Sequence, residues 1–325
     1  MSPILEIENL AVSFNNGRRP AVRGISLSLA AGEIVGLVGE SGSGKSLSAL
    51  SVMGLDPPGA RRDSGRIIFK GRDLGQLENA ERRRLCGARL GMVFQEPLTA
   101  LNPVLSIGEQ VAEIFRLRAG QGRRKARASA LAMLAKVGLP NPAEAAESYP
   151  HRFSGGMRQR VVIAMALALS PELLVADEPT TALDPTIAAQ ILDLLVRLTR
   201  ENNSAVLFIT HNLRLLAGLA SRVLVMYAGL VLEEAPAPDI FENPGHPYTQ
   251  GLLKALPPSL DEPAPGRLTA IGGLPPTPGR WPTGCPFQPR CPRAFEPCAA
   301  SLPPLYDSGP GRKTRCFLSE GGASC

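Results

Sequence analysis

The first 235 residues predict an α/β fold with a largely parallel sheet. Three short apolar runs, at residues 34–38, 173–176 and 205–209, are candidates for buried strands, and each is followed by glycine or polar residues. Helical segments separate the runs, and strands that alternate with helices are typical of parallel sheets. Ligands of open α/β sheets bind at the carboxyl ends of such strands. We therefore expect a binding site at that edge.

Length and composition favour a globular protein of about two domains. The chain has 325 residues, of which 44% are hydrophobic and 20% charged, with a net charge of +6; a domain holds roughly 150 residues. Basic residues cluster without interleaved aromatic residues, so we expect no nucleic-acid partner. No apolar run approaches the roughly 18 residues of a membrane span, and the N-terminus has no signal pattern. These features predict a cytosolic location.

The chain changes character near residue 236. Of its 31 prolines, 19 lie from residue 236 onward, and five of its six cysteines lie from residue 285 onward. Proline at this density excludes long helices and central strands. We therefore divide the chain into a domain of residues 1–235 and a Pro/Cys-rich C-terminal extension of residues 236–325.

A helical insertion is expected within the first domain. The segment 109–137 has a helix-forming composition that is broken by a turn at 120–122, and residues 157–169 form a second helical stretch. The chain between the first two apolar runs is much longer than a simple crossover needs. The pattern predicts a helical subdomain over about residues 96–169.

A glycine-rich loop follows the first apolar run. Its sequence fits G-x-x-x-x-G-K-S/T between a predicted strand and a predicted helix, although a chance glycine-rich turn would also fit. In such a loop the backbone N–H groups point at phosphate oxygens, the lysine reaches the β and γ phosphates, and the final hydroxyl binds Mg²⁺. The candidate phosphate-binding residues are Gly39, Glu40, Ser41, Gly42, Ser43, Gly44, Lys45 and Ser46.

Two adjacent acids end the second apolar run. Asp177 at the strand end would hold the hydration shell of Mg²⁺, and Glu178 would face the γ-phosphate where water attacks. Alone, such a pair is often only the start of a helix, but here it follows a phosphate-binding loop in the same domain. The two motifs together predict nucleotide hydrolysis.

A second candidate anion site lies shortly before the acid pair, at residues 153–157 (Phe-Ser-Gly-Gly-Met). Ser154, Gly155 and Gly156 would open a helix and offer a hydroxyl, free N–H groups and a helix dipole. The segment resembles the signature sequence of ATP-binding cassette (ABC) ATPases. The resemblance implies a P-loop NTPase with an ABC-type nucleotide-binding domain, and ATP and Mg²⁺ as cofactors. It also implies two ATPase subunits that dimerise head to tail.

Further positions resemble the pattern of this family. Gln95 resembles the Q-loop glutamine that contacts Mg²⁺ and water, and Asp184 lies in a segment similar to the D-loop, which crosses the dimer interface. His211 resembles the switch histidine that orients the γ-phosphate and water. Phe14 suits the aromatic residue that stacks on adenine, or equally a strand-packing residue. The resemblance thus implies catalysis by Glu178, His211 and Gln95, and Mg²⁺ ligation by Ser46, Gln95 and Asp177.

Segments of the extension resemble ATPases of dipeptide and oligopeptide importers. These segments are residues 244–253, 284–292 and 315–316. The resemblance implies an ATP-hydrolysing subunit of a bacterial peptide importer, peripheral on the cytoplasmic face of the inner membrane. The implied partners are a second ATPase subunit, expected to be a paralogue, two transmembrane permease subunits and an extracytoplasmic substrate-binding protein.

Four cysteines of the extension form a candidate metal site: Cys285, Cys291, Cys298 and Cys316. Their wide spacing lacks the C-x₂₋₄-C pair usual for structural zinc, and thiolates also bind iron–sulfur clusters. Members of the peptide-importer group with this spacing are expected to bind a 4Fe–4S cluster, and this sequence fits. Zn²⁺ and packed free thiols are alternatives. Cys86 and Cys325 are unassigned.

Other functions share parts of this pattern. The same transport role could serve nickel, glutathione or antimicrobial peptides, because no residue of this chain contacts cargo. A soluble ABC ATPase in translation or DNA maintenance normally carries two cassettes or a long coiled coil, and this sequence has neither. A regulatory or metal-sensing protein would have no need of Glu178. The sequence therefore favours the peptide importer.

Overall fold

The three apolar runs form buried strands. They are β3 (Ile34–Val38), β7 (Leu173–Asp177) and β8 (Ala205–Thr210), and every residue in them is buried. A continuous apolar sequence suits strands that are covered on both faces. The strand prediction is confirmed for all three runs.

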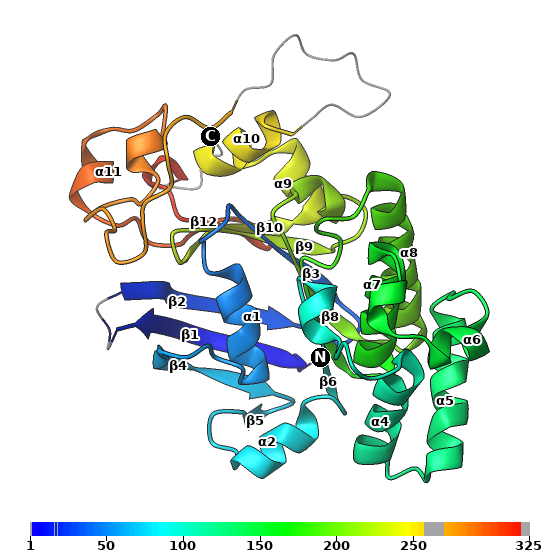
Figure 1. Ribbon diagram of the computed structural model, residues 1–325. Helices are drawn as coiled ribbons and strands as arrows, with labels where there is room; N and C mark the ends of the chain where they lie inside the picture. The colour runs from blue at the N-terminus through cyan, green and yellow to red at the C-terminus, as the bar shows by residue number, and fades with distance from the viewer. Residues whose placement is uncertain (1, 16, 18, 257–269, 320–325) are drawn as a thin grey trace. The chain divides into compact units, whose positions relative to one another are not determined.

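The computed structural model describes residues 2–15, 17, 19–256 and 270–319 (Figure 1). The chain forms two compact units. Unit 1 consists of Met1–Leu5, Leu29–Glu33 and Phe69–Phe208, and unit 2 consists of Glu6–Ser28, Ile34–Ile68 and Ile209–Cys325. Unit 2 therefore joins strands from the start of the chain to the C-terminal segment.

Unit 1 combines parallel strands with a series of helices. Its strands lie in the order β8–β7–β6, and β6 (Leu90–Val93) pairs with β7 in parallel. The elements between β6 and β7 in the sequence are all helical, cyan to green in Figure 1. They are α3 (Pro97–Ala100), α4 (Ile107–Ala119), α5 (Arg123–Lys136), α6 (Pro142–Glu147), the 3₁₀ turn η1 (Pro150–Arg152) and α7 (Gly155–Leu167). The unit also contains β5 (Arg72–Asp73), α2 (Asn79–Leu85) and α8 (Pro185–Glu201).

Local sequence signals set the ends of these helices. The Ser106 hydroxyl accepts a hydrogen bond from the Glu109 N–H at 3.3 Å, which caps the start of α4. Gly120 ends α4 in the left-handed conformation with φ at 63°, and α5 begins at Arg123. The predicted break between two helices at residues 120–122 is confirmed.

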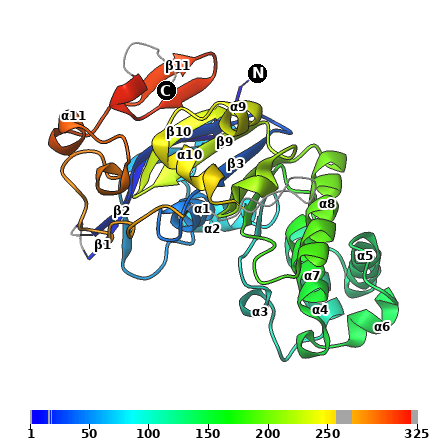
Figure 2. The same ribbon diagram turned by 90° about the horizontal axis from the view of Figure 1, so that it is seen from above.

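Unit 2 contains strands of two sheets together with several short helices. Its remaining elements are β1 (Leu5–Phe14), β2 (Arg19–Leu29), α1 (Lys45–Met53), β4 (Ala60–Phe69), η2 (Leu213–Leu216), β9 (Arg222–Tyr227), β10 (Leu230–Pro236), α9 (Ala237–Glu242), α10 (Pro247–Lys254), η3 (Gln288–Arg290), α11 (Glu296–Ala300), β11 (Tyr306–Gly309), β12 (Arg312–Thr314) and η4 (Phe317–Ser319). Here β2–β1–β4 are neighbours, and a second sheet runs β11–β12–β10–β9–β3. Helix α9 packs on β9 and β10 (Figure 2).

The second sheet of unit 2 is mixed. β3 and β9 are parallel, whereas β10 is antiparallel to both β9 and β12. The reversal occurs at Ala228 and Gly229, where both φ angles are positive, 51° and 80°. Two such residues make the tight turn that joins adjacent antiparallel strands. The expectation of a largely parallel sheet is therefore correct only for part of the sheet.

The turn at Gly229 supplies a stability prediction. A Cβ atom at Gly229 would lie 2.6 Å from the carbonyl oxygen of Ala21, whereas at Gly218, which also has a positive φ, it would meet nothing within 4 Å. We expect Gly218→Ala to lower the free energy of unfolding by about 1 kcal/mol, because a residue with a Cβ atom is strained at a positive φ even where there is space for it. Gly229→Ala should cost roughly 1–3 kcal/mol more, because the backbone must shift. Urea denaturation measures both, and equal losses would contradict the close packing of the turn.

Candidate active site

The phosphate loop of unit 2 is held in a tight curl between β3 and α1. At Gly39 a Cβ atom would lie 2.1 Å from the carbonyl oxygen of Met226, so only glycine fits there. Gly44 precedes α1 with φ at 102°. Lys45 is 4% exposed, and its ammonium donates to the carbonyl oxygens of Gly39 at 2.7 Å and Glu40 at 3.0 Å. The charge that would meet phosphate thus lies inside the curled loop.

The acid pair of unit 1 lies at the end of a buried strand. Asp177 is the last residue of β7 and is 5% exposed. Glu178 follows with φ at 47°, a left-handed conformation that is uncommon outside glycine. Its carboxylate accepts hydrogen bonds from the amide of Gln95 at 3.2 Å and from the hydroxyl of Thr181 at 2.8 Å. The structure therefore brings two predicted catalytic residues together. Thr181, which begins the segment similar to the D-loop, also contacts Glu178, and this contact was not expected from the motifs.

The signature segment forms the N-terminus of α7. Its Ser154 hydroxyl accepts from the Met157 N–H at 3.3 Å, and Ser154 and Gly155 are exposed. A Cβ atom at Gly156 would lie 2.5 Å from the Ile187 side chain, so this glycine lets α7 approach the first turn of α8. An exposed helix N-terminus of this kind is a typical position for a bound anion.

The remaining candidates lie at the ends of strands and helices. Asp184 caps α8 by accepting from the Ile187 N–H at 3.0 Å. His211 follows β8 and is exposed, and Phe14 ends β1 and is half-buried. Ser46 is the second residue of α1. Both Ser46 and Asp177 carry oxygen donors of the kind that Mg²⁺ prefers.

Two residues of the C-terminal segment, Tyr248 and Arg290, contact the phosphate loop; both lie in segments that resemble peptide-importer ATPases, but no role at the site was expected for either. The N–H of Glu40 donates to the Tyr248 hydroxyl at 3.0 Å, and its carboxylate receives the Arg290 guanidinium at 2.7 and 3.0 Å. Both residues are more than 200 positions away in the sequence. A buried tyrosine and an arginine in a proline-rich segment give no local signal of such a contact.

The four cysteines of the extension line a single cavity, together with Phe287. The N–H of Cys285 donates to the carbonyl of Cys298 at 2.8 Å. Burial raises the pKa of the Cys285 and Cys291 thiols above the ordinary value. Among the described residues no group of three or more His, Cys, Asp or Glu side chains is positioned to hold a metal ion. The donor set of four thiols nevertheless suits iron–sulfur or zinc chemistry. Cys325 lies outside the described residues.

Comparison with known proteins identifies the class of this protein. A family model described as "ABC transporter" matches residues 22–181, and one described as "Oligopeptide/dipeptide transporter, C-terminal region" matches residues 232–298. The dimeric post-hydrolysis structure of the ATP-binding cassette MJ0796, bound to ADP and Pi, is 29% identical with a TM-score of 0.63, over 72% of this chain and 98% of that one. Fold and motifs together define an ATP-binding cassette.

Curated relatives extend the match along nearly the entire chain. The dipeptide transport ATP-binding protein DppD of Bacillus subtilis is 46% identical over 98% of this chain and 96% of its own length. DppD of Escherichia coli is 46% identical over 96% of both chains. The chain therefore belongs to the ABC transporter family and is an ATPase of that family. No helix in the described part of the chain is long and apolar enough to cross a membrane.

The contacts of Glu178 predict separable effects on ATP binding and hydrolysis. Glu178→Gln keeps the shape and an acceptor for Thr181, but the amide cannot take a proton from water. We expect kcat to fall by about 10²-fold or more, with the ATP dissociation constant nearly unchanged. Steady-state ATPase assays and calorimetric ATP titration measure the two quantities. Glu201→Gln, at an exposed carboxylate of the same unit, is the matched control. Substantial residual turnover in Glu178→Gln would show that another group is the base.

Proposed function

We propose that this chain is the ATP-hydrolysing subunit of an importer of dipeptides and oligopeptides, bound to the cytoplasmic face of the inner membrane. The observation that carries the proposal is the match of both its cassette and its C-terminal region to peptide-transport ATP-binding proteins. The cassette model names no transported substrate, so a match to the cassette alone would not indicate what is transported. The matched C-terminal region supports the peptide assignment and the proposed extension of residues 236–325.

The residues have distinct roles in the proposed hydrolysis. The phosphate loop binds ATP through its backbone N–H groups, and Lys45 exchanges its present bonds with Gly39 and Glu40 for the β and γ phosphates. Mg²⁺ neutralises phosphate charge when bound, and Ser46, Gln95 and Asp177 are its proposed ligands.

Glu178 is the proposed base, which accepts a proton from the attacking water, and His211 orients the γ-phosphate. Phe14 is the proposed adenine contact.

A second ATPase subunit completes the proposed site. Ser154 and Gly155 are exposed at the start of a capped helix, where a nucleotide held by another subunit would meet the positive end of the helix dipole. Asp184 lies on the proposed dimer contact. The similar solved structure of the ATP-binding cassette MJ0796 is dimeric, which supports this arrangement. We propose that the partner is a paralogue of this chain.

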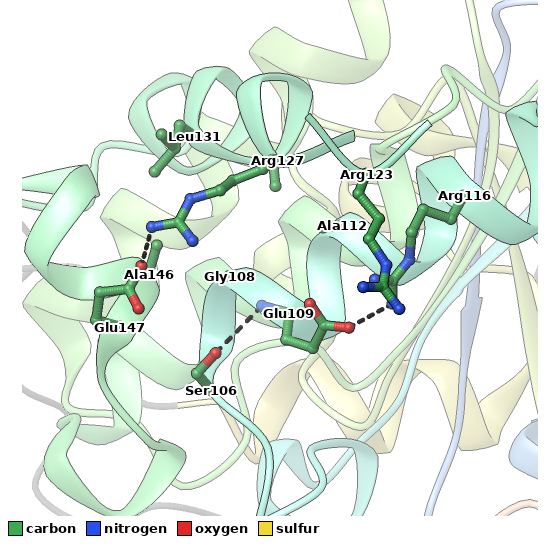
Figure 3. Close-up of a pocket in the computed structure, with 11 residues that line it drawn as sticks. Ser106, Gly108, Glu109, Ala112, Arg116, Arg123, Arg127, Leu131, Ala146 and Glu147 are labelled. Atoms are coloured by element: carbon green, nitrogen blue, oxygen red, sulfur yellow. Dashed lines mark hydrogen bonds and ion pairs between the residues drawn. The ribbon is translucent and has the colours of Figure 1, made fainter. Parts of the chain in front are cut away.

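The surface after Gln95 is the proposed contact with the permease subunits. Leu98 and Val104 are apolar side chains with exposed fractions of 60% and 75%. In the sequence they lie between Gln95 and α4. Helices α4, α5 and α6 enclose a cavity of about 370 Å³ (Figure 3). Figure 3 shows Arg127 paired with Glu147 on one side of this cavity. Because Gln95 bonds Glu178, this surface is placed to relay the state of the catalytic residues.

The proposed transport role predicts loss of peptide uptake in two variants. In a deletion strain complemented with the gene, wild-type protein should restore uptake of labelled di- and oligopeptides. Glu178→Gln should abolish uptake while the variant still copurifies with the permease subunits. Val104→Asp should lower both uptake and copurification, because it places a charge in the proposed contact.

The same experiment separates the alternatives. Leu117→Asp, at another exposed apolar side chain of unit 1 (73% exposed), is the control for a surface charge outside the contact. Uptake of nickel but not peptides would contradict the proposed substrate. Subunit analysis of the purified complex identifies the partner ATPase, and two copies of this chain would contradict the paralogue.

We also propose that the four cysteines bind a 4Fe–4S cluster. The support is the single cavity that Cys285, Cys291, Cys298 and Cys316 line and the affinity of four thiolates for such clusters. Protein purified without oxygen should be brown and contain about four iron and four sulfide per chain. Cys298→Ser should lower both contents, whereas Cys86→Ser, outside the cavity, should leave them unchanged. Colourless protein with stoichiometric zinc would contradict the cluster.

A further inference from the structure

The Glu40 side chain of the phosphate loop is held by an arginine from the C-terminal segment. The two terminal guanidinium nitrogens of Arg290, Nη1 and Nη2, donate to the two carboxylate oxygens of Glu40 at 2.7 and 3.0 Å. The Arg290 side chain is 5% exposed and that of Glu40 is 25% exposed. A planar two-point contact of this kind sets the orientation of both groups, which a single charge contact does not.

Other contacts hold the Arg290 guanidinium in place. Its Nε donates to the carbonyl of Gly272 at 2.9 Å, and one Nη also donates to the Tyr227 hydroxyl at 3.2 Å. The guanidinium lies 5.8 Å from the centre of the Tyr227 ring. An arginine whose donors are already directed in this way loses little conformational freedom when it binds Glu40.

The backbone of Glu40 is held from the same side. Its N–H donates to the Tyr248 hydroxyl at 3.0 Å, and Tyr248 is fully buried against Tyr227 and Phe287, with ring centroids 4.6 and 5.2 Å away. Glu40 is thus attached to the C-terminal segment by both its backbone and its side chain. The Glu40 carbonyl oxygen also accepts a hydrogen bond from the Lys45 ammonium at 3.0 Å.

These attachments matter most when nucleotide binds. To reach the phosphates, Lys45 must leave the carbonyl oxygens of Gly39 and Glu40, so the loop loses the bonds that now hold its curl from inside. The contacts from Tyr248 and Arg290 do not involve Lys45 and can persist. The loop N–H groups then stay directed at the phosphates without an added ordering cost.

We propose that Arg290, acting through Glu40 and assisted by Tyr248, is a positioning residue that holds the phosphate loop in its ATP-binding shape. The inference rests on the proposed role of the loop in binding ATP. Arg290 does not touch the reacting atoms in this arrangement, so it acts on ATP affinity and leaves the chemical step unchanged. Arg290 lies directly before Cys291 in the sequence, so the proposed support of the loop comes from the segment that carries the four cysteines.

The test measures the ATP dependence of hydrolysis in the intact transporter. Arg290→Met should raise the KM for ATP about tenfold with kcat within about twofold, since a charge-assisted hydrogen bond contributes about that factor. Arg290→Lys restores the charge without the two-point geometry and should give an intermediate KM. Arg280→Met, at an exposed arginine of the same segment, is the matched control and should behave as wild type.

A double variant separates positioning from general stability. If Arg290 acts through Glu40, adding Arg290→Met to Glu40→Ala should raise KM no further than Glu40→Ala alone. Effects that multiply, or a KM for Arg290→Met within twofold of wild type, would overturn the proposal. A fall in thermal stability of Arg290→Met with an unchanged KM would also overturn it, since it would make the contact purely structural. Absence of ATP turnover in the wild-type transporter would instead contradict the proposed function.

Discussion

The close approach of the phosphate loop to strand β9 is the constraint on which the proposed nucleotide site of unit 2 depends. Gly39 leaves no room for a side chain against the Met226 carbonyl, and the Gly229 N–H donates to the Ser43 carbonyl at 3.0 Å. Both halves of the loop are thus fixed to the β9–β10 hairpin by backbone contacts. Strand β12 pairs with β10 of the same hairpin. The C-terminal segment is therefore built onto the element that shapes the loop.

In unit 1 a strained backbone conformation and two hydrogen bonds arrange the proposed catalytic residues. Glu178 leaves the buried strand β7 in a left-handed conformation, and its carboxylate is held by Gln95 and Thr181. Left-handed conformations of non-glycine residues are costly and persist where the surrounding structure imposes them. The contact joins the start of the helical series to the end of β7. A movement of the segment after Gln95 can therefore change the position of Glu178, the proposed base, through this hydrogen bond.

Local sequence indicated several features that depend on neighbouring residues. Apolar runs became buried strands, Ser106 and Gly120 set the ends of α4, and Ser154 capped α7. The contacts of Glu40 could not be predicted in this way, because its partners are more than 200 residues away in the sequence. Arg290 lies 250 residues away, in a segment where proline removes helical and strand periodicity. The antiparallel β10 was also missed, because the tight turn at Ala228 and Gly229 carries only one glycine.

The sequence by itself determined the class of fold, the glycine-rich loop proposed to bind phosphate and the order of the motifs, because each depends on neighbouring residues and on backbone geometry. Only the tertiary structure decided which distant side chains support that loop. Arg290 and Tyr248 meet Glu40 because the hairpin and its packed aromatic side chains bring the C-terminal segment there. Contacts of this kind arise from packing between segments far apart in the chain, and no local pattern records them.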